Sequence, residues 1–60
     1  MKTEPTKFYT VHEIAGALGV SMRSVRRWIK QKKLVAHHFG AVVRIAEIDL
    51  KAFIAAHRHV

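Results

Sequence analysis

Six basic side chains lie within the segment SMRSVRRWIKQKK (21–33), and no acidic residue separates them. The arginine guanidinium donates two parallel hydrogen bonds to a phosphate, or to the O6 and N7 atoms of guanine, and lysine adds a compact charge. Apolar residues recur at every third or fourth position of the same segment, which predicts a helix with one apolar side. The segment therefore has the composition of a helix that packs on a domain by one side and binds a polyanion by the other.

The charge of the whole chain agrees with a polyanionic partner. Its 60 residues include 11 lysines and arginines and 4 acidic residues, for a formal charge of +7. In so small a protein, this favours nucleic acid as the partner, ahead of an anionic membrane or an acidic protein. No apolar run approaches the roughly 20 residues of a membrane-spanning helix, and no signal-peptide hydrophobic region lies near the start. We therefore expect a cytoplasmic protein.

Two capped helices are predicted around this segment. The capping box Thr10-Val11-His12-Glu13 predicts a first helix over Val11–Leu18, because the hydroxyl and the carboxylate each accept a hydrogen bond from the other residue's amide. Gly19 follows, where a left-handed residue ends many helices. Ser21 suits the N-cap of a second helix, expected from Met22 to about Lys32. Two helices joined by a short turn with glycine form a helix-turn-helix.

The two sides of the second predicted helix differ in character. At roughly 100° per residue, its apolar side chains cover an arc of about 120°; they are Met22, Val25, Trp28 and Ile29. Its basic side chains cover about 100° of the opposite side; they are Arg23, Arg26, Arg27 and Lys30. Solvated helix faces usually mix acids with bases, so a purely cationic side indicates DNA binding.

After Leu34 the pattern changes to alternation. Val35–His38 and Val42–Ile45 predict a β-hairpin, with glycine in the turn between them. A third helix is expected from about Glu47 to Ala56, with Glu47 and Asp49 near its positive N-terminal end. The fold class is thus mainly α with a small β-hairpin: a winged helix-turn-helix, in the order helix, turn, helix, hairpin, helix. We expect a flexible leader at residues 1–7, one DNA-binding domain at 8–56 and a short tail at 57–60.

The basic residues are predicted to have separate roles on DNA. Arg23 and Arg27 are the candidates for reading bases in the major groove. Ser24 flanks them and can contact a base edge or a thymine methyl group. Arg26 lies at the edge of the cationic arc, where contact with a phosphate fits better than contact with a base. Lys30, Lys32 and Lys33 would hold the DNA backbone at the helix end. His38 and Arg44 are the DNA-binding candidates on the wing.

Three segments carry a resemblance to a known family. Tyr9–Ala15, Leu18–Ser21 and Ser24–Ile29 resemble the small MerR-type winged helix-turn-helix domains, and among these they are most similar to phage excisionases, the recombination directionality factors. The resemblance covers Phe8 to about Ile54.

The resemblance implies both contacts and partners. It implies groove contacts at Arg23, Ser24, Arg27 and Lys30, backbone support from Arg26, and a wing near the minor groove. It further implies a protein that binds and bends attachment-site DNA, with neighbouring copies of itself and a tyrosine recombinase (integrase) as partners, at the nucleoid of a bacterial host. Two departures stand out. The wing tip has Phe39-Gly40-Ala41 where relatives often have Arg or Lys, and Ala46 provides no side-chain cap for the third helix.

Other functions stay open from the sequence. A small prophage-type MerR-like transcriptional regulator shares the fold, although such regulators generally dimerise through a long C-terminal helix, and the chain ends soon after the third predicted helix. A protein-interaction module could use the basic helix against an acidic partner, in which case duplex DNA would bind weakly even at low salt. Binding to a membrane surface is disfavoured, because the apolar side of the helix is needed in the core.

Some residues admit a second interpretation. Trp28 could stack on a base, but its place on the apolar arc favours closing the core between the second helix and the wing. Phe39 could wedge into the minor groove, bind a partner, or fold back onto Trp28. His37 and His38, adjacent on a strand, point to opposite faces and do not share a metal. His57 and His59 alone make an incomplete metal site.

Catalysis and cofactors are not expected. The chain has no cysteine, which excludes disulfides and thiolate metal sites. No paired carboxylates and no glycine-rich phosphate loop occur, and Glu13, Glu47 and Asp49 are accounted for at helix starts. We expect a protein that is not an enzyme and that has no metal, no cofactor and no small-molecule substrate.

Overall fold

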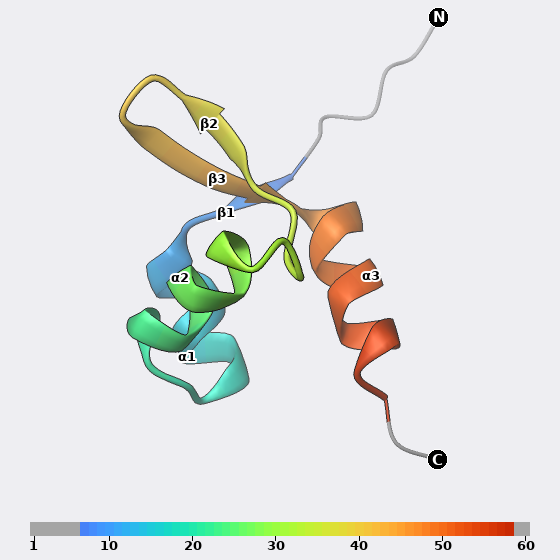
Figure 1. Cartoon of the computed structure of the whole chain (residues 1–60). Coiled ribbons are helices and arrows are strands. Elements are labelled where there is room, and N and C mark those ends of the chain that lie inside the picture. The colour runs from blue at the N-terminus through green and yellow to red at the C-terminus, as the bar shows by residue number, and fades with distance from the viewer. Residues whose placement is uncertain (1–6, 59–60) are drawn as a thin grey trace, which may run out of the picture.

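A computed structural model describes residues 7–58, and within that range three helices pack near the base of a small sheet (Figure 1). Strand β1 (Phe8–Tyr9) comes first, followed by helix α1 (Val11–Leu18), helix α2 (Met22–Lys30), the hairpin strands β2 (His37–Phe39) and β3 (Val42–Ala46), and helix α3 (Glu47–Ala56). The order of helices and hairpin confirms the predicted winged helix-turn-helix. Of the predicted leader at 1–7 and the predicted tail at 57–60, residues 1–6 and 59–60 lie outside the described residues.

Helix α1 begins and ends as its sequence predicts. The Glu13 amide donates to the Thr10 hydroxyl over 3.0 Å, and the Thr10 amide donates to the Glu13 carboxylate over 2.9 Å. Both halves of the capping box are therefore formed. Gly19 ends the helix with φ of 69°, a left-handed conformation in which glycine has no Cβ to clash. The turn then leads directly to Ser21, whose hydroxyl accepts from the Ser24 amide and starts α2.

Helix α2 ends at Lys30, two residues before the predicted end at Lys32. Lys32 is left-handed, with φ of 64°. The Lys32 amide donates to the Ile29 carbonyl over 3.0 Å, and the Lys33 amide donates to the Trp28 carbonyl over 2.9 Å. These two bonds form a Schellman motif, which closes a helix and normally has glycine at the left-handed position. The composition continued to favour helix there, but the backbone turns back to satisfy the last carbonyls.

The hairpin forms a wing that projects from the helices (Figure 1). Gly40, in the two-residue turn between the strands, has φ of 66°, which is the role expected of a turn glycine. The pairing is antiparallel, with His38 opposite Val43 and Phe39 opposite Val42. On its other edge β3 pairs with β1, so that the sheet order is β1-β3-β2. The sequence did not predict β1, because two residues carry no alternation to recognise.

Helix α3 starts without a side-chain cap, as Ala46 suggested. The Glu47 amide instead donates to the Lys7 carbonyl over 2.9 Å, so the segment before β1 supplies the missing acceptor. The Tyr9 hydroxyl donates to the Glu47 carboxylate over 3.2 Å. These contacts tie the start of α3 to the first strand, beside the base of the wing.

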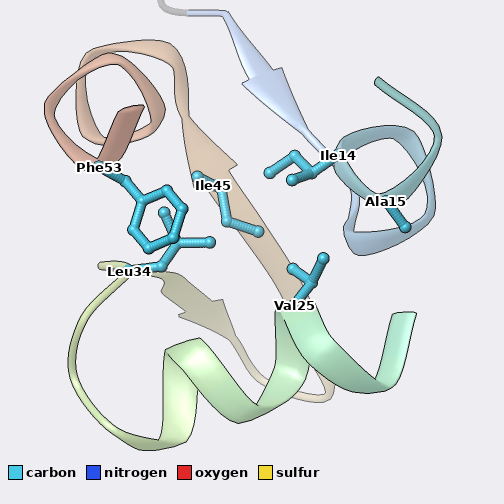
Figure 2. Packing of buried hydrophobic residues seen from close by; sticks show 6 residues of the cluster. All are labelled: Ile14, Ala15, Val25, Leu34, Ile45 and Phe53. Atoms are coloured by element: carbon cyan, nitrogen blue, oxygen red, sulfur yellow. The ribbon is translucent and has the colours of Figure 1, made fainter. Parts of the chain in front are cut away.

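The three helices, β3 and the connection after α2 contribute to one small core (Figure 2). Val25 of α2 and Ile45 of β3 are 0% exposed, and Leu34, from the connection after α2, is 1% exposed. Side chains from α1 and α3 complete the cluster: Ile14, Ala15 and Phe53. Because Val25 is fully buried in this cluster, the orientation of α2 about its own axis is fixed. Its opposite side must therefore face away from the domain.

Candidate nucleic-acid interface

The outward side of α2 is cationic over its whole length. Four basic side chains are exposed there: Arg23, Arg26, Arg27 and Lys30. Within residues 7–58, none of them forms an ion pair or a side-chain hydrogen bond. The apolar residues of the predicted stripe lie on the core side, with Val25 buried and Met22, Trp28 and Ile29 packed against the core. The predicted division of the helix into two sides is confirmed, and the predicted DNA contacts of these residues stay predictions.

Ser24 is less exposed than Arg23 and Arg27, the other residues predicted to contact bases. Its side chain is half-buried, and its hydroxyl accepts a hydrogen bond from the Ser21 hydroxyl over 3.2 Å. Its amide donates to the same Ser21 oxygen over 3.1 Å. The residue thus takes part in the N-terminal cap of α2. Its own hydroxyl proton is free to donate, so a base contact from Ser24 stays a prediction at the N-terminal end of the cationic face.

A groove of about 450 Å³ separates α2 from the wing. It brings together three of the predicted DNA-binding residues from three different elements: Arg26 of α2, His38 of β2 and Arg44 of β3. The lining combines apolar with basic and polar residues: Thr10, Val11, His12, Met22, Arg26, Ile29, His38, Ala41, Val43 and Arg44. A groove with this lining suits a chain of phosphates that passes between a helix and a hairpin.

A smaller hollow of about 190 Å³ lies at the C-terminal end of α2. The two hollows share Ile29 and His38, and the second also includes Lys32. The early end of α2 is what places Lys32 here, since the left-handed turn directs the chain toward the wing. Lys33 is exposed and lines neither hollow, so the structure separates it from the other basic residues of the groove.

Arg44 forms one hydrogen bond to the backbone of its own strand. Its guanidinium donates to the carbonyl of Val43 over 2.8 Å, and the residue is half-buried. An arginine has five N–H donors, so this bond leaves others free for a phosphate. The bond also restricts the rotamers of the side chain, which lowers the entropy lost when a ligand is bound.

The aromatic residues do not pack as predicted. Trp28 does close the core, but against α3: its ring lies 4.9 Å from that of Phe53. The expected position between α2 and the wing is therefore wrong. Phe39 does not fold back onto Trp28 either, because it lies edge-on to the ring of Phe8, 6.0 Å away, and stacks on His37 at 6.3 Å. It points to the face of the sheet that lacks α2, and 55% of its surface is exposed. The ring pairs Trp28–Phe53 and Phe8–Phe39 join residues far apart in the sequence, and the periodicity of a single helix or strand does not predict such contacts.

The two adjacent histidines face opposite sides, as the strand period predicts. His37 lies 3.3 Å from the Asp49 carboxylate of α3, whereas His38 lines the groove. Within the described residues, no group of three or more histidine and carboxylate side chains is placed to hold a metal ion. In the same part of the chain, no helix has the length and apolar character needed to cross a bilayer.

Two residues of the groove were missed from the sequence. Thr10 and His12 line it, at the start of α1. Thr10 was interpreted only as a cap, and His12 as one of the residues inside the capping box. Their place beside the wing depends on how α1 packs against β3, for which a single sequence carries no local signal.

Comparison with known proteins supports the fold. The profile of a family described as a helix-turn-helix domain matches residues 8–58, which is most of the chain. Neither the curated proteins nor the solved structures that were compared with the chain include a match.

Proposed function

The chain belongs to the helix-turn-helix domain family, and on that basis we propose that it reads a defined sequence of double-stranded DNA with α2. A helix-turn-helix domain implies DNA binding, in which the second helix lies in the major groove. The observation that carries the proposal is the outward side of α2, which is cationic, exposed and without ion pairs inside residues 7–58. The burial of Val25 on the other side holds that surface outward.

The proposed assignment of contacts follows the position of each side chain. Arg23 and Arg27 would read guanines, because their exposed guanidinium groups lie on the outward side of α2 and can donate two parallel bonds. Arg26 and Arg44 would hold a phosphate strand in the groove between α2 and the wing. Lys30, Lys32 and Lys33 would add backbone contacts at the helix end. We propose action by binding and bending, without catalysis.

One copy reads too little DNA for a specific site. Helix α2 has 9 residues, so it is about 13.5 Å long and spans about four base pairs at roughly 3.4 Å each. A sequence of that length recurs by chance throughout any genome. Useful specificity therefore requires several copies on neighbouring sites, or a second DNA-binding protein beside them.

For the biological role, we propose an excisionase that binds and bends attachment-site DNA and directs excision by a tyrosine recombinase. The support is the resemblance of Tyr9–Ala15, Leu18–Ser21 and Ser24–Ile29 to phage excisionases. The proposed partners are neighbouring copies of the protein and the integrase, at the bacterial nucleoid in the cytoplasm. The alternative role, a small MerR-like transcriptional regulator, would use the same surface of α2.

Selection of bound duplexes from a random pool, at roughly physiological salt, tests the proposal. Short motifs in direct repeat, together with a bend measured by energy transfer across the selected site, would support the excisionase role. An inverted repeat would contradict it and favour the dimeric regulator. Binding that is weak even at low salt would contradict DNA reading altogether and favour the acidic-protein partner.

A further inference from the structure

Two hollows share His38 in their lining. Arg26 lines the groove between α2 and the wing together with this imidazole, and Lys32 lines the smaller hollow together with it. Ile29 of α2 is the other residue in the lining of both hollows, and we call the two shared residues the junction. An anion bound at the junction would therefore have the basic groups of Arg26 and Lys32 in the two hollows and an apolar side chain beside it.

The strand register fixes which histidine lies there. His38 pairs with Val43, and Val43 lines the same groove, so both side chains lie on the side of the sheet that faces α2. His37 lies on the other face, where it is 3.3 Å from the Asp49 carboxylate and 5.8 Å from the ring of Phe8. Neighbouring imidazoles thus have opposite surroundings: one has a carboxylate partner and the other has basic neighbours.

The charged and titratable groups around His38 come from every element that borders the hollows. They are Arg26 of α2, Lys32 of the following connection and His12 of α1. Arg44 of β3 also lines the groove, but it pairs with His37 and leaves β3 on the face opposite His38. None of the residues that line the two hollows is acidic. An imidazolium at His38 consequently has no counterion within the described part of the protein, and an anion from outside would supply it.

We propose that the junction at His38 is a binding site for one backbone phosphate of DNA, and that His38 binds it as the protonated imidazolium. The inference rests on the proposed DNA binding and adds a chemical consequence to it. The proton comes from solvent, so the complex takes up a proton when it forms. Arg26 and Lys32 contribute fixed charges at the same phosphate or its neighbours, whereas the contribution of His38 depends on pH, because imidazoles titrate between about pH 5 and 8.

Two measurable effects follow from this proton. A hydrogen bond to a charged group is stronger than one to a neutral group, so acidification from pH 8 to pH 5.5 should tighten DNA binding by about fivefold through His38. One more phosphate is neutralised at the lower pH, and the salt dependence of the affinity should steepen by about 0.9 in the slope of log K against log salt. The phosphodiester keeps its charge over this range.

The experiment measures the dissociation constant of the full chain with a selected duplex by fluorescence anisotropy, over a salt series at pH 8 and at pH 5.5. Wild-type protein is compared with His38→Gln, which keeps a hydrogen-bond donor without the titration, and with His38→Lys, which has a fixed charge. His37→Gln is the matched control on the opposite face of the same strand. Circular dichroism melts at both pH values establish that each variant is folded.

The outcomes separate the inference from the proposed function. We expect the tightening of DNA binding between pH 8 and pH 5.5 to be about fivefold smaller in His38→Gln than in wild type. His37→Gln should show the full wild-type tightening. At pH 8, His38→Lys should have the slope of log K against log salt that wild type has at pH 5.5. A full response in His38→Gln, or an equal loss in His37→Gln, overturns the inference while leaving DNA binding intact. If wild-type protein does not bind the duplex at either pH, the proposed function itself is wrong.

Discussion

The backbone conformation of Lys32 lowers the stability of the fold, whereas its side-chain charge is expected to favour DNA binding. It is left-handed, with φ of 64°, and its amide closes the Schellman motif at the end of α2. A residue with a Cβ is disfavoured in this conformation by about 1–2 kcal/mol, whereas glycine adopts it freely but loses about 0.5–1 kcal/mol of backbone entropy on folding. Lys32→Gly should therefore raise the free energy of unfolding by about 0.5–1 kcal/mol.

The assay is thermal unfolding followed by the fluorescence of Trp28, which is the one tryptophan of the chain. For a domain of this size, the expected gain corresponds to an increase in Tm of about 2–8 °C. The same variant should bind DNA more weakly, with a salt slope reduced by about 0.9, if Lys32 makes the proposed phosphate contact. Stability and affinity are thus expected to change in opposite directions.

Lys33→Gly is the matched control. Lys33 carries the same charge one residue later, and among the described residues Lys32 is the one non-glycine residue with positive φ. Both substitutions remove one positive charge from a protein of net charge +7, so both relieve the same repulsion between like charges. Lys33→Gly relieves no backbone strain, and the added glycine costs backbone entropy on folding. The free energy of unfolding should therefore fall by about 0.5 kcal/mol in Lys33→Gly. An equal gain in both variants, or no gain in Lys32→Gly, would refute the argument from the backbone conformation.

Three further predictions concern the helices that position the cationic surface. Gly16→Ala should raise the free energy of unfolding by about 1 kcal/mol, because an added Cβ meets nothing within 4 Å and alanine favours helix. Gly19→Ala should lower it by about 1 kcal/mol, because φ is 69° there. Urea unfolding of the two variants side by side measures the contrast. Thr10→Ala should cost about 1 kcal/mol by the same method, because the Glu13 amide loses its acceptor. Trp28→Ala should cost about 2–3 kcal/mol through the lost contact with Phe53. The DNA affinity of Trp28→Ala, measured well below its Tm, should stay within about threefold of wild type. A much larger loss of affinity would indicate that Trp28 stacks on a base.

Local signals predicted most of the elements, because they operate over three or four residues. The capping box predicted the start of α1, and Gly19 predicted its end. Ser21 predicted the start of α2 in the same way. The alternation around Gly40 predicted the hairpin and the opposite directions of His37 and His38. Each of these features is a backbone preference or a hydrogen bond between near neighbours.

Features that depend on distant contacts could not be predicted. Strand β1 exists because Phe8 and Tyr9 pair with the end of β3, and no pattern in two residues shows this. Trp28 has Phe53 of α3 as its partner, and a helical wheel gives the buried side of a helix without naming what covers it. The hollows that Arg26 and Lys32 line together with His38 likewise require the packing of α2 against the wing, which the charge pattern alone does not contain.

The central claim is that α2 reads bases through its outward arginines, and Arg27→Ala tests it most directly. Its affinity should be compared with that of wild type on the selected duplex and on a scrambled duplex of the same length, with Lys30→Ala as the control for a lost charge on the same side of α2. We predict that Arg27→Ala loses about 1–3 kcal/mol of binding free energy on the selected duplex and little on the scrambled one. Equal losses on both duplexes would show that Arg27 contacts only phosphates, and would contradict the account of α2 as a reading helix.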